Sequence, residues 1–251
     1  GFRWWHYFIT KKRFLDRKIL PFDLIIDLQS KLRNTIILKK IPHNNFYSST
    51  FNYRFCSNQA LYASKDHLIN LNIFLKARIK VSNFDLNFLS KKYILESKRL
   101  LPNKNYIGFS ITQGNTYRKK SWNIENFINL ADQLTNKNKI PVFFVEKKNL
   151  SLINQIKKNI PSALFPEHNS NISCPALVTA LSSRLDQAIS IDNGVMHMIG
   201  LANIPMIVLF GPTDSDKFAP KSDKIKILDS KKIYDSVDIN TIKVKDVLKL
   251  I

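Results

Sequence analysis

Apolar and polar positions alternate along the chain in two different periods. Short runs rich in β-branched and aromatic residues are typical of buried strands. These runs are Phe22–Asp27, Tyr106–Ile111, Ile140–Val145, Gln187–Ile191, Met206–Phe210 and Ile225–Leu228. Longer segments separate them, and in residues 124–131 the apolar residues fall at i, i+3, i+4 and i+7, as on one face of a helix. The alternation predicts an α/β fold with a doubly wound parallel sheet.

Further helices are expected where amphipathic or apolar segments lie between turn residues. They cover Lys31–Lys40, His67–Ala77, Phe84–Tyr93, Leu150–Ile160, Pro175–Arg184, Val195–Leu201 and Thr241–Ile251. Val195–Leu201 is apolar on nearly all sides, so we expect it to be buried. The polar segment Lys98–Asn105, which contains Pro102, is the expected linker between a domain of residues 1–100 and one of residues 101–251.

Polar turns follow three of the expected strands. Thr112–Ser121 carries Arg118, Lys119 and Lys120 without an acidic residue, Asp192-Asn193-Gly194 opens the next helix, and Gly211–Asp214 follows Met206–Phe210. Ligands of parallel sheets bind beyond the carboxyl ends of the strands. The free N–H groups of a helix start favour a phosphate. The sequence therefore indicates an anion site built from these turns.

Charge and cysteine content narrow the class of protein. The net charge is +20 over 251 residues. A coding bias toward Lys, an anionic substrate and an anionic membrane surface all remain open as its cause. Nucleic acid is disfavoured because the lysines are spread along the chain. Cys56 and Cys174 have no partner motif, which argues against a metal site or a disulfide framework and favours the cytoplasm. No apolar run is long enough to span a bilayer, and no signal peptide pattern is present.

The first residues are basic and aromatic. Phe2–Asp16 could form an amphipathic helix whose Arg3, Trp4 and Trp5 enter a membrane interface. The alternative is that these aromatic side chains pack on a domain that is partly missing.

Four motifs, in order, resemble glycosyltransferase family 9, the ADP-heptose:lipopolysaccharide heptosyltransferases. Asp23–Arg33 is similar to its Asp-Leu-x-Ile-Asp-Leu-Gln-x-x-x-Arg segment. Thr112–Asn123 corresponds to its strand-end loop followed by Lys-x-Trp-Pro, with Asn123 in place of Pro. Asp192–His197 matches Asp-Ser/Thr-Gly-x-x-His, with Asn193 at the Ser/Thr position, and Phe210–Asp214 matches Phe-Gly-Pro-Thr-Asp in full. The family's opening Gly-Asp loop, which supplies its catalytic base, has no match before Phe22, so we expect an amino-truncated version.

The resemblance implies a GT-B architecture of two Rossmann-like domains with parallel sheets, the first incomplete. It assigns catalysis to Lys120 and Asp192, and acceptor contacts to Gln29 and Arg33. It implies a nucleotide-sugar site formed by Thr112, Gln113, Gly114, Lys120, Glu146, Asp192, Asn193, Gly194 and His197, with Thr213 and Asp214 in a nearby turn. Several have a structural alternative: a solvated helix face at Arg33, a surface Lys at Lys120, a helix cap at Asp192, core packing at His197 and turn formation at Thr213 and Asp214. Trp122 is expected in the core.

The implied reaction moves a heptose-type sugar from ADP-heptose or a similar donor to a lipopolysaccharide core acceptor, with inversion and without a metal or other cofactor. The implied partners are the nucleotide-sugar, a lipid-linked saccharide and an anionic membrane face touched from the cytoplasm, but no nucleic acid. Two alternatives stay open. One is a GT-B enzyme that transfers from, or epimerises, another nucleotide-sugar, and the other is a truncated, non-catalytic nucleotide-binding module.

Overall fold

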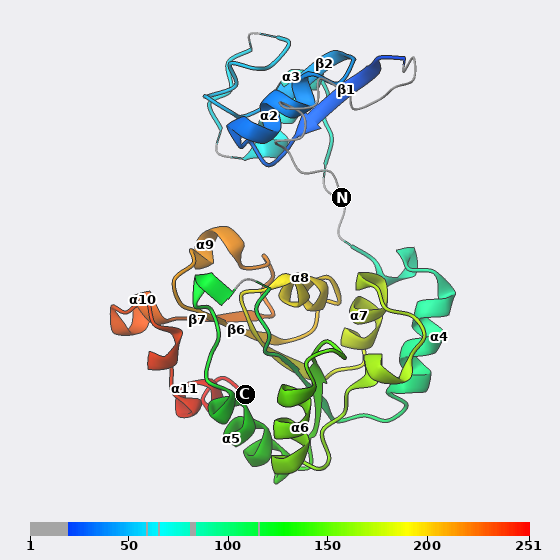
Figure 1. Cartoon of the computed structure of the whole chain (residues 1–251), viewed down its shortest axis with the longest axis vertical. Helices are drawn as coiled ribbons and strands as arrows, with labels where there is room; N and C mark the ends of the chain where they lie inside the picture. Colours follow the sequence, from blue (N-terminus) through cyan, green and yellow to red (C-terminus); the bar gives the residue numbers. More distant parts are fainter. Residues whose placement is uncertain (1–19, 59, 65, 81–83, 115) are drawn as a thin grey trace. The chain divides into compact units, whose positions relative to one another are not determined.

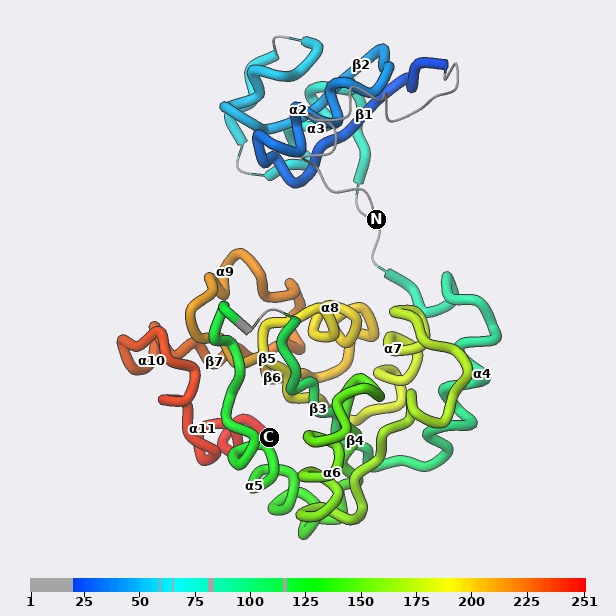
Figure 2. The backbone as a smooth tube through the Cα atoms, in the orientation of Figure 1, coloured from blue at the N-terminus to red at the C-terminus, as the bar shows by residue number. Residues whose placement is uncertain are grey.

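The apolar runs form two separate parallel sheets (Figures 1 and 2). The computed structural model describes residues 20–251 except 59, 65, 81–83 and 115. The expected helix Phe2–Asp16 lies outside the described residues. The chain divides into two compact units, residues 1–82 and 83–251.

The first unit contains a βαβ element. Strand β1 (Phe22–Asp27) is followed by α2 (Leu32–Lys39) and by β2 (His43–Ser48), which pairs with β1 in parallel. Helix α3 (His67–Leu75) packs its Phe74 into an aromatic cluster with Tyr47. The rings of these two residues meet edge to face, with centroids 5.4 Å apart.

A buried polar network closes the carboxyl end of the β1–β2 pair. The carboxylate of Asp27 accepts hydrogen bonds from the hydroxyls of Thr35, at 2.6 Å, and Ser48, at 3.0 Å. It also accepts the backbone N–H groups of Gln29 and Ser30. Because a buried carboxylate is costly without donors, these bonds are what allow Asp27 to sit in the core of the unit. The apolar pattern identified the strand but not this network.

The second unit is a doubly wound sheet in the order β4-β3-β5-β6-β7, with neighbouring strands parallel. Its strands are β3 (Tyr106–Ser110), β4 (Ile140–Phe144), β5 (Gln187–Ile191), β6 (Met206–Phe210) and β7 (Ile225–Asp229). Its helices are α4 (Lys91–Leu100), α5 (Ile124–Thr135), α6 (Leu150–Asn159), α7 (Pro175–Ser182), α8 (Gly194–Leu201), α9 (Ser215–Phe218), α10 (Ser230–Tyr234) and α11 (Val244–Leu248). Short 3₁₀ turns cover Leu86–Phe88, Thr116–Arg118, Pro166–Asn169 and Ile239–Thr241.

Successive residues of each strand pack into different hydrophobic cores, one on each face of the sheet, because side chains alternate between the two faces. In β6, Ile207 and Leu209 pack with α5, α6 and α11, whereas Met206, Val208 and Phe210 pack with α7 and α8. Both faces are therefore covered, which explains why β6 reads as a continuous apolar run. Helices α4 and α7 lie side by side on one flank of the unit (Figure 1).

Three expectations about the chain's organisation differ from the structure. The boundary between units lies at residue 82 rather than 100, since Lys98–Leu100 belong to α4 and α4 packs on α7. The helix expected over Phe84–Tyr93 is a 3₁₀ turn followed by the start of α4. The closing helix is limited to α11, because a 3₁₀ turn precedes it. The α/β class with parallel sheets is confirmed.

Candidate active site

The candidate site lies at the carboxyl edge of the second sheet, between β3 and β5. The connection after β3 leads to β4 on one side, while β5 is followed by β6 on the other. Loops that leave neighbouring strands in opposite directions open a crevice between them, and such switch points hold ligands in doubly wound sheets. The loop after β3 and the turn after β5 contain most of the residues that the sequence singled out.

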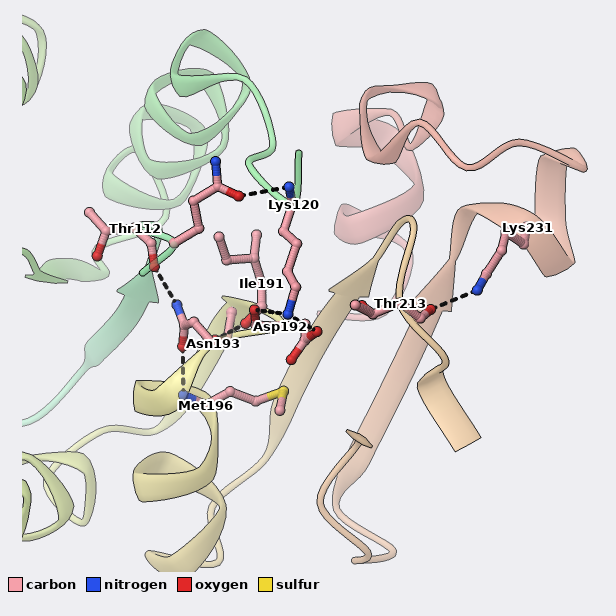
Figure 3. Close-up of polar contacts among 10 residues, drawn as sticks. Thr112, Lys120, Ile191, Asp192, Asn193, Met196, Thr213 and Lys231 are labelled. Atoms are coloured by element: carbon pink, nitrogen blue, oxygen red, sulfur yellow. Dashed lines mark hydrogen bonds and ion pairs between the residues drawn. The ribbon is translucent and has the colours of Figure 1, made fainter. Parts of the chain in front are cut away.

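Lys120 and Asp192 form an ion pair at this crevice, in which Asp192 is buried and Lys120 largely buried (Figure 3). Lys120 Nζ lies 2.5 Å from Asp192 Oδ2, and the two side chains are 12% and 8% exposed. The backbone N–H of Lys120 donates to Gln113 Oε1 at 2.7 Å, so Gln113 holds the loop in place. The reading of Lys120 as a free surface side chain is therefore wrong.

Asn193 joins the two loops and starts α8. Its Oδ1 accepts the N–H of Met196 at 2.9 Å, as an N-cap side chain does. Its Nδ2 donates to the carbonyl of Thr112 at 2.9 Å and to Ser110 Oγ at 2.8 Å (Figure 3). The first N–H groups of α8, at Gly194 and Val195, have no acceptor within the helix and remain suited to an anion.

An open cleft of about 580 Å³ lies beside this helix start. It is lined by Thr112, Gln113, Gly114, Glu146, Lys148, Asn149, Asn193, Gly194, Val195 and Met198. At both glycines of the lining, no atom lies within 4 Å of the place a Cβ would take. A ligand can thus approach the backbone closely at either position.

A second cleft, of about 770 Å³, shares Thr112 and Glu146 with the first. Glu146 pairs with Lys148 at 2.5 Å across its exposed rim. Its wall includes Glu167, which the sequence reasoning missed because no motif marks it. Burial, and secondly the charge of Glu146, raises the pKa of the Glu167 carboxyl above its usual range.

Other residues predicted for the site have different roles. His197 was expected inside a buried helix, but it is exposed, because α8 buries mainly Met196 and Ile199. Asp214 caps α9 by accepting the N–H groups of residues 216 and 217, which favours the turn-forming reading. The backbone carbonyl of Thr213 accepts a hydrogen bond from Lys231 Nζ. The Thr213 hydroxyl is buried and has no hydrogen-bond partner among the described residues.

Two further side chains beside the loop are structural. Trp122 is buried, as expected, and its Nε1 donates to the carbonyl of Ile242 at 2.9 Å. Asn123 precedes α5, but its side chain makes no capping bond, so the sequence placed the helix start correctly and its cap wrongly.

Gln29 and Arg33 belong to the first unit. Both contact Asn34, which donates to Gln29 Oε1 at 2.5 Å and accepts from Arg33 Nε at 3.3 Å. Arg33 lies in the first turn of α2, just beyond the carboxyl end of β1. Their assignment to an acceptor stays a prediction.

Neither a metal cluster nor a membrane span occurs in the described ranges. No three His, Cys, Asp or Glu side chains there are grouped so that they could hold a metal ion. Among the same residues, no helix is both long and apolar enough to cross a bilayer.

A parallel sheet with a polar cleft at its switch point is the arrangement of nucleotide-binding α/β proteins. The model of glycosyltransferase family 9 (heptosyltransferase) matches residues 15–245. The chain belongs to this family and is a glycosyltransferase. A search of curated proteins gave no match.

Solved structures agree on the fold. The family 9 glycosyltransferase of Veillonella parvula DSM 2008 has a TM-score of 0.68 at 16% identity, over 92% of this chain and 72% of its own. The E. coli heptosyltransferase WaaC with ADP has a TM-score of 0.65 at 14% identity, over 92% of this chain and 72% of its own. The E. coli ADP-heptose LPS heptosyltransferase II has a TM-score of 0.61 at 14% identity, over 90% and 74%. The fold predicted from the motifs is thereby confirmed.

Proposed function

We propose that this glycosyltransferase moves a heptose-type sugar from ADP-heptose, or a similar nucleotide-sugar, to a lipopolysaccharide core acceptor. The observation that carries the proposal is the largely buried Lys120–Asp192 pair, next to the N–H groups of Gly194 and Val195 at the start of α8. Two structures of E. coli WaaC, with ADP and with ADP-2-deoxy-2-fluoro heptose, support an adenine-nucleotide donor for this chain.

The reaction is a displacement at the anomeric carbon of the sugar. The acceptor oxygen forms a bond to that carbon while the bond to the diphosphate breaks, and ADP leaves with the electron pair. Negative charge then grows on the diphosphate, so donors fixed at that position stabilise the transition state more than the bound substrate. Lys120 Nζ and the N–H groups of Gly194 and Val195 are the donors we assign to this role, with Thr112 and Gln113 beside them.

Two carboxylates can bind the sugar hydroxyls of the nucleotide-sugar. Sugar hydroxyls donate hydrogen bonds to carboxylates, and Asp192 lies next to the proposed diphosphate position. Glu146 borders both clefts, where it can accept the hydroxyls of a ribose. The acceptor hydroxyl must lose its proton to a base, and we assign no residue of this chain to that step.

Metal independence is part of the proposal. The charge of a leaving diphosphate needs compensation, and here one lysine and a helix start supply it without a divalent ion. Activity in excess chelator supports this view, whereas an absolute requirement for magnesium contradicts it.

The test is calorimetric titration of the chain with ADP, UDP and GDP, first with chelator and then with magnesium. We expect metal-independent binding of ADP in preference to the other two nucleotides. Lys120→Ala is expected to weaken ADP binding at least tenfold, or roughly 1.4 kcal/mol. Lys139→Ala is the matched control, because Lys139 also forms an ion pair, with Asp186 at 2.8 Å, but borders a different cleft. Preference for UDP or GDP would reassign the donor, and equal binding by Lys120→Ala would remove that residue from the site.

A further inference from the structure

Helix α3 in the first unit presents apolar side chains on a buried face and on an adjoining, exposed face. Phe74 and the side chain of Asn70 are buried against the unit. On the adjoining face, Ile69 and Ile73 are 51% and 42% exposed. Residues four apart share a helix face, so these two isoleucines lie in one stripe. Exposed apolar side chains that form one contiguous stripe indicate a surface that another molecule covers.

The chain after α3 folds back and extends this apolar stripe. Lys76 ends the helix in the left-handed conformation, with φ 50°. The N–H and carbonyl of Ile79 then bond the side-chain amide of Asn72, at 2.8 and 2.9 Å. Asn72 is adjacent to Ile73 and one turn from Ile69, so Ile79, which is 46% exposed, joins the same face.

Three exposed cations lie close to these isoleucines in the chain. Lys76, Arg78 and Lys80 follow one another at alternate positions, and residues 67–84 contain no Asp or Glu. We call the six side chains together the α3 surface. It combines apolar area with positive charge, which is the composition of segments that lie in a bilayer interface.

Charge indicates what covers the α3 surface. Residues 1–82 carry 15 Lys and Arg against 4 Asp and Glu, a net +11, and residues 83–251 carry 24 against 15, a net +9. Both units have a net positive charge, so the balance of charge favours an anionic partner over the rest of the chain or a second copy of it. The complementary partner is anionic and has an apolar layer next to its charges.

We propose that the α3 surface docks the first unit on an anionic lipid bilayer. Ile69, Ile73 and Ile79 enter the region just below the headgroups, while the three cations contact lipid phosphates. The inference deepens the proposed function, since a lipid-linked acceptor would be met at such a surface. Lipid binding is measured here without donor or acceptor, so its failure is distinguishable from a failure of donor binding.

The test is co-sedimentation of the full chain with vesicles of phosphatidylcholine alone, and of phosphatidylcholine with phosphatidylglycerol at roughly three to one. We expect binding to the anionic vesicles only, weakened by roughly 0.5 M salt. Substituting all three cations by Ala is expected to weaken vesicle binding about fivefold for each cation removed. The pair Ile69→Ser and Ile73→Ser is expected to lower binding at least tenfold, because the inserted apolar area is lost.

Matched controls use exposed residues of the second unit. Leu95→Ser with Ile233→Ser replaces two exposed apolar side chains, and Lys91, Lys137 and Lys158→Ala removes three exposed charges. Both controls are expected to bind vesicles like the unaltered chain. Equal binding by the α3 variants, or equal losses in the controls, would overturn the proposal.

Thermal unfolding and sedimentation velocity test the other occupants. If the α3 surface is covered by the rest of the chain, Ile69→Ser with Ile73→Ser lowers the melting temperature by several degrees. If a second copy covers it, the unaltered chain is a dimer and this variant is a monomer. Either result contradicts lipid docking, which requires an unchanged melting temperature and a monomeric chain.

Discussion

Replacing Lys120 with Met should expose how much the buried ion pair contributes to stability. The change leaves the Asp192 carboxylate, 8% exposed, without its cation at 2.5 Å. Removing one member of a buried pair costs roughly 3–5 kcal/mol. Because both side chains retain slight exposure, we take about 3 kcal/mol, which lowers the melting temperature of a unit of this size by about 6–12 °C.

The double variant Lys120→Met with Asp192→Asn separates stability from ligand binding. It removes both charges, so most of the lost stability should return. Binding of ADP should stay at least tenfold weaker, since the proposed phosphate contact is still missing. Asp192→Asn alone keeps Lys120 and should retain ADP affinity. Sugar transfer should fall, because the variant loses a carboxylate that accepts hydrogen bonds from sugar hydroxyls. The assays are thermal unfolding and calorimetric titration with ADP on all four chains of the cycle.

Two results would refute this reasoning. If Lys120→Met melts within about 1 °C of the unaltered chain, the ion pair does not stabilise the fold as a buried pair is expected to. If the double variant binds ADP normally, Lys120 does not hold the diphosphate. Lys139→Met is the control, because its pair with Asp186 is 33% and 42% exposed. Breaking such a pair should cost at most about 1 kcal/mol.

Three more outcomes follow from the second unit. Gly211→Ala should destabilise the unit by about 1–3 kcal/mol in denaturant titration, because its Cβ would lie 2.8 Å from Ile239 Cβ and 3.1 Å from the same residue's backbone N. Asn193→Ala should cost about 1 kcal/mol through loss of the α8 cap, whereas Asn193→Ser should keep the cap, as thermal unfolding would show. Hydrogen bonds, first from Arg99, lower the pKa of Glu96 to about 2. The ionised Glu96 carboxylate therefore stabilises the folded chain at pH values above its ordinary pKa of 4.5, and this stabilisation is lost as the pH falls toward 2. The difference in melting temperature between Glu96→Gln and the unaltered chain should shrink over that pH range.

The sequence predicted the strands well because burial there leaves a local signature. Gln187–Ile191 and Met206–Phe210 have the predicted limits, since both faces of the sheet are covered and most of the strand residues are apolar. The unit boundary was predicted poorly for the opposite reason. Helix α4 is fixed to the second unit partly by Glu96, which accepts the hydroxyl of Ser170, 74 residues away, at 2.6 Å. Contacts of that range leave no pattern in the residues around Pro102.

The site shows the same division. The motifs brought Lys120 and Asp192 to one edge of the sheet, but the direct ion pair between residues 72 apart was not predicted. His197 was misjudged because local apolarity does not reveal which face of α8 the neighbouring elements cover. Glu167 was missed since its environment, and not its sequence position, raises its pKa.

The structure also explains how Asn193 can stand where the family has Ser or Thr. A Ser or Thr hydroxyl can accept the N–H at the third position of α8, but it offers a single proton to donate. The amide of Asn193 accepts the N–H of Met196 with Oδ1 and, with Nδ2, donates to both Thr112 and Ser110. It therefore caps the helix and fixes the loop after β3 at the same time. The loop so fixed carries Lys120, whose position defines the proposed diphosphate site.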